Sequence, residues 1–207
     1  MPVPVAPTTA VAVVGVLAVA LPAAAGGLKP NPANDPRLLK KPIEDERYDR
    51  ATKCRDNVPK GMKALQHWLE HNIRGESWGV YRCEKLKGQG DNYSLHSESR
   101  AIDWHLDAGV AKENRAAKRF IDTLLAADRK GNVRALARRM GIQGLIFDCR
   151  AWWAGMEELG EYSYCYKRNG DLRHNLDRTQ AHRDHIHIEL SWDGAKKRTS
   201  FWKSPLA

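Results

Sequence analysis

Hydrophobic and polar positions along the chain follow two periods, which predict both helices and strands. Apolar residues recur at helical spacing in three segments, so we expect helices over residues 59–73, 113–127 and 132–140. Alternating or short apolar runs predict strands over residues 77–83, 101–106, 145–148 and 185–190. No internal repeat is present, so the pattern predicts a single α+β domain with a small antiparallel sheet and flanking helices.

The first part of the chain has a different pattern. Residues Ala10 to Gly26 form an apolar run that ends in small residues, with Ala23 and Ala25 placed as in an A-x-A cleavage site. The run is short and rich in Ala for a spanning helix. We therefore expect a signal peptide over residues 1–25 and no stable membrane span after processing. No Lys or Arg precedes the run, so an uncleaved anchor or a misassigned start codon stays open.

Residues 26–53 are rich in proline and charge and have no sustained period, which predicts a linker or an extended arm. The compact domain is then expected to begin near Cys54 and to cover residues 54–207. This length suits one domain with a sizeable core and is hardly enough for two.

Charge separates the same two parts of the chain. The 34 Lys and Arg and the 25 Asp and Glu all follow Leu28, and together they give a formal charge of +9. A hydrophobic content of 42% excludes wholesale disorder, and a mean hydropathy of -0.60 excludes a polytopic membrane protein. The positive charge favours an anionic partner, either a nucleic acid or a cell envelope.

Cysteine usage is consistent with export. The four cysteines lie in the charged part of the chain, and no two of them form a C-x-x-C pair. Three disulfide connectivities are open, and we favour Cys54–Cys83 with Cys149–Cys165, because each would join neighbours in the sequence. Four buried free thiols are the alternative.

The last predicted strand carries the first candidate chemistry. Alternation places His185, His187 and Glu189 on one face of the segment HIHIEL and its aliphatic residues on the other. Two imidazoles that point the same way from one strand, close to His182, are typical of a metal site or a proton-transfer site.

The centre of the chain supplies matching ligands. In the segment SLHSESRAIDW, Asp103 interrupts an apolar strand, which costs stability unless the carboxylate is paired or coordinated. His96, Asp103 and one of the two strand histidines would form a set of two nitrogens and one oxygen. A zinc site with three protein ligands leaves a fourth position for water and is typically catalytic.

These residues carry a family resemblance. The pattern S-x-H-x-x-x-R-A-x-D, followed downstream by H-x-H, resembles the zinc peptidases of the lysostaphin, D-Ala-D-Ala carboxypeptidase and hedgehog superfamily, over about residues 54–192. The runs around these motifs resemble most closely a group of secreted, mostly uncharacterised bacterial members. The resemblance implies a hedgehog/DD-peptidase-like fold and a Zn2+ ion held by His96, Asp103 and His187.

The same resemblance implies roles for neighbouring residues. His185 would be a catalytic side chain, and His182 matches a further active-site histidine of murein endopeptidase-like members. Other members carry a glutamate base just before the last ligand, where this chain has Arg183 and Asp184, so the base is not assigned by the motif. Ser99 stands where the family usually has glycine.

The implied activity is that of a zinc-dependent peptidase acting on peptidoglycan stem peptides, as a D,D-carboxypeptidase or an endopeptidase. We expect a monomer that is secreted or associated with the cell envelope. Arg100 or Arg82 could bind a substrate carboxylate through a bidentate guanidinium, although for each arginine taken singly we favour a surface position in a basic protein.

Two other functions stay open. A zinc-binding but inactive module could grip a cell-wall polymer or a protein partner, but it would not need extra imidazoles beside an open metal position. A secreted nuclease would use the positive charge. The histidines do not match the H-x-T/S strands or the ββα-metal arrangement of nucleases, so we expect no nucleic-acid partner.

Overall fold

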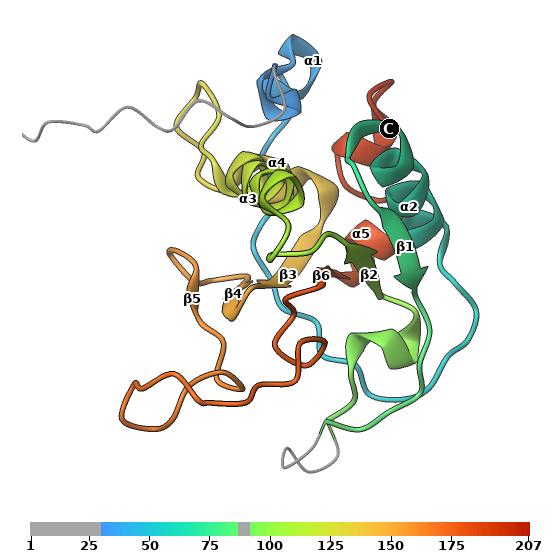
Figure 1. Ribbon diagram of the computed structural model, residues 1–207. Helices are drawn as coiled ribbons and strands as arrows, with labels where there is room; N and C mark the ends of the chain where they lie inside the picture. Colours follow the sequence, from blue (N-terminus) through green and yellow to red (C-terminus); the bar gives the residue numbers. More distant parts are fainter. Residues whose placement is uncertain (1–29, 87–91) are drawn as a thin grey trace, which may run out of the picture.

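The computed structural model describes residues 30–86 and 92–207 and has an antiparallel sheet at its centre (Figure 1). The sheet has six strands in the order β1-β2-β6-β3-β4-β5. Every neighbouring pair is antiparallel. The strands are β1 (Glu76–Gly79), β2 (Ala101–His105), β3 (Ile142–Phe147), β4 (Arg150–Trp153), β5 (Gly160–Glu161) and β6 (His185–Leu190).

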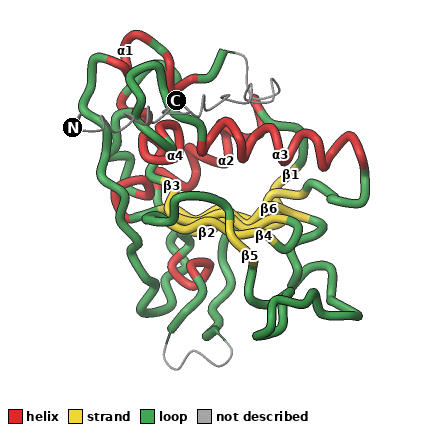
Figure 2. Tube along the Cα trace, turned by 90° about the vertical axis from the view of Figure 1, so that its left-hand side faces the viewer, coloured by secondary structure: helices red, strands yellow, loops and turns green. Residues whose placement is uncertain are grey.

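Helices cover one face of this sheet (Figure 2). The longest described helices are α2 (Lys60–Asn72) and α3 (Ala111–Leu125), and the shorter ones are α1 (Pro36–Leu39), α4 (Ala135–Met140) and α5 (Trp192–Ala195). Three 3-10 turns complete the described elements: η1 (Pro32–Asn34), η2 (Leu95–Glu98) and η3 (Phe201–Lys203). Within residues 30–86 and 92–207, no helix combines the length and the apolar character that a membrane crossing requires.

This arrangement confirms the predicted α+β class and the antiparallel sheet. The three long periodic segments are helical, with ends that differ from the expected ones by up to three residues. The sequence analysis did not predict β4 and β5. β4 directly follows a tight turn at Asp148 and Cys149, which both have positive φ, and β5 pairs with β4 farther along the chain. Such a turn depends on residues that do not usually adopt this conformation, so the sequence did not indicate it.

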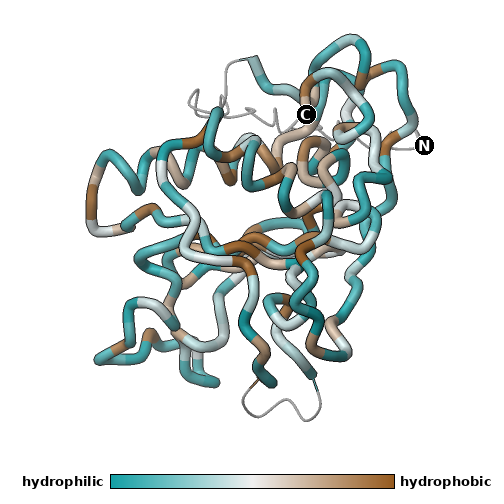
Figure 3. The backbone as a smooth tube through the Cα atoms, turned by 90° about the vertical axis from the view of Figure 1, so that its right-hand side faces the viewer, coloured by the Kyte–Doolittle hydropathy of each residue, from teal (hydrophilic) through white to brown (hydrophobic). Residues whose placement is uncertain are grey.

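The main core lies between the helices and the sheet, where hydrophobic segments of both layers face each other (Figure 3). On the sheet side it includes Ile102, Trp104, Ile186 and Ile188. On the helix side, Trp68 of α2 packs against Phe120 of α3, with ring centroids 6.1 Å apart. The aliphatic face of β6 is therefore buried in the core. The histidines of β6 alternate with these residues, so they face the opposite, loop-covered side of the sheet.

The first predicted strand is shorter than expected. β1 ends at Gly79, where φ is 133° and the pairing with β2 shifts register. A φ of this size is open to glycine and disfavoured for other residues. The chain leaves the sheet there, and the following residues contact His96 of the 3-10 turn η2: the Val80 carbonyl lies 2.8 Å from His96 Nδ1, and the Arg82 N–H donates to the His96 carbonyl.

The segment expected to be a linker or extended arm is part of the folded unit. Ala33 and Leu38 are fully buried in the main core. Farther along, the backbone N–H of Asp49 donates to Gln143 at 2.9 Å, and Thr52 donates to Glu98. The expected boundary at Cys54 is therefore wrong, because the arm buries apolar side chains that its proline-rich pattern conceals. The predicted signal peptide and residues 26–29 lie outside the described residues.

Two disulfides join the cysteine pairs that we favoured. Cys54–Cys83 links the arm to the segment after β1, and Cys149–Cys165 links the β3–β4 turn to the long loop before β6. Their sequence separations are 29 and 16 residues. Closing loops of these lengths in the unfolded chain stabilises the fold by about 3 kcal/mol each in the chain-entropy account. Both bridges restrain loops on the histidine-bearing side of the sheet.

Candidate metal centre

Three elements bring the predicted ligands together. Asp103 of β2 and His187 of β6 are directly paired in the antiparallel ladder, so their side chains leave the sheet on the same face. His96 lies on η2, a turn that begins where the Ser94 hydroxyl accepts from the His96 N–H at 3.3 Å. The turn ends at Ser99, whose φ of 51° lies in the left-handed region. Glycine adopts this conformation readily, whereas other residues, such as Ser99 here, adopt it less often.

The three donor atoms form a nearly equilateral triangle. His96 Nε2 lies 3.1 Å from Asp103 Oδ1 and 3.1 Å from His187 Nδ1, and the last two atoms are 3.0 Å apart. Ligands of a tetrahedral zinc ion with bonds of about 2.0–2.1 Å are separated by about 3.3–3.4 Å. An ion just outside the triangle could therefore bind all three atoms after a shift of a few tenths of an ångström.

Contacts behind the ligands select the nitrogen that each imidazole presents. His96 Nδ1 donates to the carbonyl of Val80 at 2.8 Å, which leaves Nε2 for the site. His187 Nε2 donates to Glu189 Oε1 at 3.2 Å, which leaves Nδ1. Histidines that bind metals usually donate their second N–H to a carboxylate or carbonyl in this way. Both the three donor atoms and the hydrogen bonds that orient the two imidazoles therefore suit a bound metal ion.

Glu189 depends on a glycine opposite it. Gly144 of β3 pairs with Glu189 of β6, and a Cβ atom at Gly144 would collide with the Glu189 carboxylate. The absent side chain at Gly144 therefore provides the space in which Glu189 reaches His187. Sequence reasoning placed Glu189 on the histidine face but gave it no role. Its position two residues after His187 was the signal, because residues i and i+2 of a strand share a face.

Charge within the cluster is strongly coupled. Burial disfavours the ionised Asp103 carboxylate, but the neighbouring His187 and His96 imidazoles outweigh burial and hold the pKa of Asp103 well below its usual range. Burial likewise lowers the pKa of His187, but Asp103 and Glu189 outweigh it and raise that pKa to about 10. Without a metal, His187 is therefore an imidazolium between two carboxylates. A divalent cation would replace its proton.

His185 lies beside the triangle and is held from behind. Its Nε2 is 3.4 Å from Asp103 Oδ1, and its Nδ1 donates to Asp184 Oδ1 at 2.7 Å. Asp184 is fixed in turn by the Thr179 hydroxyl at 2.7 Å. Burial lowers the pKa of His185 below its ordinary value, despite the neighbouring carboxylates. A neutral imidazole with a fixed tautomer therefore presents Nε2 to the site.

His182 is the fourth imidazole of the cluster. Its ring centroid lies 4.8 Å from that of His185 and 5.5 Å from that of His187. Its Nδ1 donates to the Gln180 carbonyl at 3.1 Å. Burial, followed by repulsion from the neighbouring imidazoles, lowers its pKa well below the ordinary value. His182 thus lies beside His185 and His187 and stays neutral there at neutral pH.

The two candidate arginines have different environments. Arg82 is largely exposed near Asp103, pairs with Glu84 at 2.8 Å, and remains able to meet a ligand. Arg100 is fully buried. Its guanidinium donates to Glu98 at 2.8 Å and to the carbonyls of Leu190 and Asp49, so it serves the fold and is not available to a substrate. Arg100 precedes β2, and its carbonyl partners lie about 50 and 90 residues away in the sequence, so the local pattern did not indicate this role.

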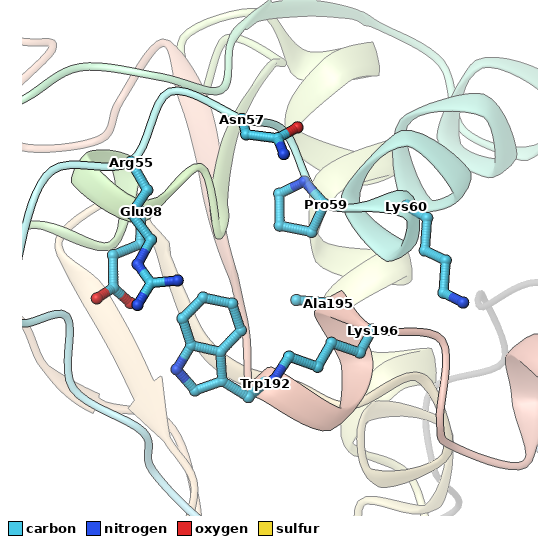
Figure 4. A pocket seen from close by; sticks show the side chains of 8 residues that line it. All are labelled: Arg55, Asn57, Pro59, Lys60, Glu98, Trp192, Ala195 and Lys196. Atoms are coloured by element: carbon cyan, nitrogen blue, oxygen red, sulfur yellow. The ribbon is translucent and has the colours of Figure 1, made fainter.

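Arg100 also supports a separate hollow of about 240 Å³ on the surface (Figure 4). Its guanidinium stacks 4.5 Å from the ring of Trp192, which lines the hollow together with Arg55 and Lys196. The hollow shares no residue with the metal triangle. We therefore assign the candidate chemistry to the histidine cluster.

An exposed aromatic surface borders the cluster. Trp78 of β1 is 48% exposed and stacks on His105 with ring centroids 4.3 Å apart, at an interplanar angle of 15°. The same indole lies 5.9 Å from the His185 ring, and Tyr81 nearby is also exposed. Sequence reasoning did not single out His105, although it lies two residues after Asp103 and pairs with His185 in the ladder.

The fold and the cluster define an α+β protein with a buried His96–Asp103–His187 group that is able to bind a metal ion. Comparison of the chain with protein-family descriptions, with curated proteins and with solved structures finds no match. The geometry of the cluster therefore carries the functional argument.

Proposed function

We propose that this protein is an extracellular or envelope-associated zinc-dependent peptidase that acts on peptidoglycan peptides, as a D,D-carboxypeptidase or an endopeptidase. The observation that carries the proposal is the three-donor triangle with the neutral His185 imidazole 3.4 Å from one of its ligands. Three protein ligands leave a position for water or substrate, which is typical of catalytic zinc sites. Two imidazoles and one carboxylate suit zinc among the common divalent ions.

A bound Zn2+ ion would lower the pKa of a water molecule and polarise the carbonyl of the scissile peptide. His96, Asp103 and His187 would hold that ion. His185 Nε2, which faces the triangle, would accept a proton during attack and return it to the leaving amine. Asp184 and Thr179 keep the His185 ring in the orientation that this transfer requires.

The surroundings of the triangle contain aromatic and cationic side chains that suit substrate binding. Trp78 offers exposed aromatic area beside His185, on which an apolar part of the substrate could pack, and Tyr81, three residues farther along the chain, is also exposed. Arg82 is a cation within range of the site and suits a substrate carboxylate. His182 and Tyr162, whose rings are 5.1 Å apart, close the other side of the cluster.

The choice of peptidoglycan rests on the motif resemblance and on features that are compatible with it. Two disulfides fit an oxidising compartment. The formal charge of +9 favours encounter with an anionic envelope. The alternative of an inactive zinc-binding module is weakened by Asp184 and Thr179, because a merely structural ion needs no second imidazole with a fixed tautomer.

Hydrolysis of muropeptides tests the proposal. Zinc-loaded protein is incubated with muropeptides, with and without a chelator, and the products are identified by mass. We expect loss of a terminal D-Ala or a split cross-link, and no reaction after chelation. His187→Ala should remove both bound zinc and hydrolysis, whereas His185→Ala should keep the zinc and lose turnover. Intact muropeptides after incubation with fully zinc-loaded protein would refute a peptidase acting on this substrate.

A further inference from the structure

A second group of metal donors lies on helix α2, away from the buried centre. His67, Glu70 and His71 are all exposed, and their donor atoms lie within 4.8 Å of one another. Residues three and four apart share one face of a helix, so this spacing places the three side chains together without any tertiary contact. The helix covers the sheet face opposite the His96 cluster (Figure 2), and the two groups share no residue.

The two imidazoles are arranged for joint use of one ion. Their ring centroids are 4.2 Å apart, and His71 Nδ1 donates to the carbonyl of His67 at 2.7 Å. This bond uses one nitrogen of His71 and leaves Nε2 free, as in the backbone-anchored histidines of metal sites. Glu70 is steadied by the Gln66 amide, which donates to Glu70 Oε1 at 3.0 Å.

We propose that His67, Glu70 and His71 form a second, exposed site for a divalent transition metal that prefers imidazole ligands, such as Zn2+, Cu2+ or Ni2+. The site has at most three protein donors, so its remaining positions are open to water or to a ligand from another molecule. Because the side chains are exposed and must be ordered on binding, its affinity is lower than that of the buried centre. Copper should bind more tightly than nickel or zinc at such a site.

A carboxylate and two imidazoles on a solvated helix face could also be ordinary surface residues. The contact of His71 Nδ1 with the His67 carbonyl favours the metal site, because it restrains the His71 ring in a position where the two imidazole centroids are 4.2 Å apart. The site does not depend on the proposed peptidase activity. Its presence would mean that the full chain binds two metal equivalents.

Metal titration of the full, metal-free chain tests the proposal. Zinc is added in competition with a chromophoric chelator, and we expect two equivalents of unequal affinity. The double variant His67→Ala/His71→Ala should lose the weaker equivalent and keep the tighter one. Both positions are exposed on a helix, where alanine is favourable, so this variant should fold. His174→Ala, which changes an exposed histidine outside both groups, is the control and should keep both equivalents.

Two results would overturn the proposal: a single zinc equivalent in the unchanged protein that the double variant retains, or a second equivalent that persists in the double variant. Copper provides an independent readout. In a His187→Ala background, the electron paramagnetic resonance spectrum of bound Cu2+ should show nitrogen ligation that disappears when His67 and His71 are replaced. If His187→Ala does not fold, the same comparison is made in protein loaded with one equivalent of zinc, which fills the tighter, buried centre.

Discussion

The metal affinity of the buried centre should rise with pH, because a metal ion competes with a proton on His187. The pKa of His187 is raised to about 10, so the metal-free protein carries this proton at neutral pH. Asp103 has a lowered pKa and is already ionised, and His182 and His185, whose pKa values burial lowers from the ordinary value, are already neutral. Between pH 7.0 and 8.5, binding should therefore displace the proton of His187.

The size of this effect follows from the pKa. One displaced proton makes the apparent affinity rise about tenfold per pH unit, or about 30-fold from pH 7.0 to 8.5. Removing a proton from a group with a pKa near 10 costs about 4 kcal/mol at pH 7, at about 1.4 kcal/mol per pH unit. Ionisation of a water at the ion would add to the pH slope and could not reduce it.

Competition with a chromophoric chelator, in the His67→Ala/His71→Ala variant, measures the affinity of the buried centre by itself. Calorimetry in two buffers of different ionisation enthalpy should report at least one proton released per zinc bound at pH 7.5. Glu189→Gln removes a carboxylate that raises the His187 pKa. In this variant the zinc affinity should therefore stop rising with pH at a lower pH than in the unchanged protein. An affinity that is unchanged between pH 7.0 and 8.5 would refute the assignment of a proton to His187.

Three substitutions test the surroundings of the centre. Asp184→Asn should lower kcat about 10–100-fold with unchanged zinc content, because the His185 tautomer is no longer fixed. An unchanged kcat would refute a role for Asp184 in positioning His185. Trp78→Ala should raise KM about two- to tenfold, the equivalent of an aromatic contact of about 0.5–1.5 kcal/mol, while kcat changes little. Arg100→Ala should destabilise the fold by about 3–5 kcal/mol in urea unfolding, because Glu98 is left buried without its partner. A loss below about 1 kcal/mol would show that Arg100 is not needed for folding.

Much of the candidate site could be predicted from local pattern. Period-2 alternation in HIHIEL placed His185 and His187 on one face and the aliphatic residues on the other, and the structure has this arrangement. A carboxylate in an apolar strand marked Asp103 as a group that needs a partner. These inferences succeed because the direction of a side chain along a strand depends only on its position in that strand.

Other features depend on contacts between distant segments. The buried state of Arg100 requires carbonyls from the N-terminal arm and from the end of β6, about 50 and 90 residues away in the sequence. The arm itself was misjudged for the same reason, because Ala33 and Leu38 are buried by helices that follow much later. Periodicity within a segment contains no information on which distant groups will cover it.

The sequence by itself determined the class of the fold, the two faces of its strands and the donors available for a metal. Only the tertiary structure decided that Asp103 and His187 are directly paired, that η2 brings His96 to within 3.1 Å of both, and that Asp184 and Glu189 hold the imidazoles from behind. The physical reason is that strand register and the closure of long loops are set by packing of the whole core. Residue types and the periodicity within each segment indicate which groups could take part in chemistry. The pairing of the strands in the sheet determines which of these groups lie in contact.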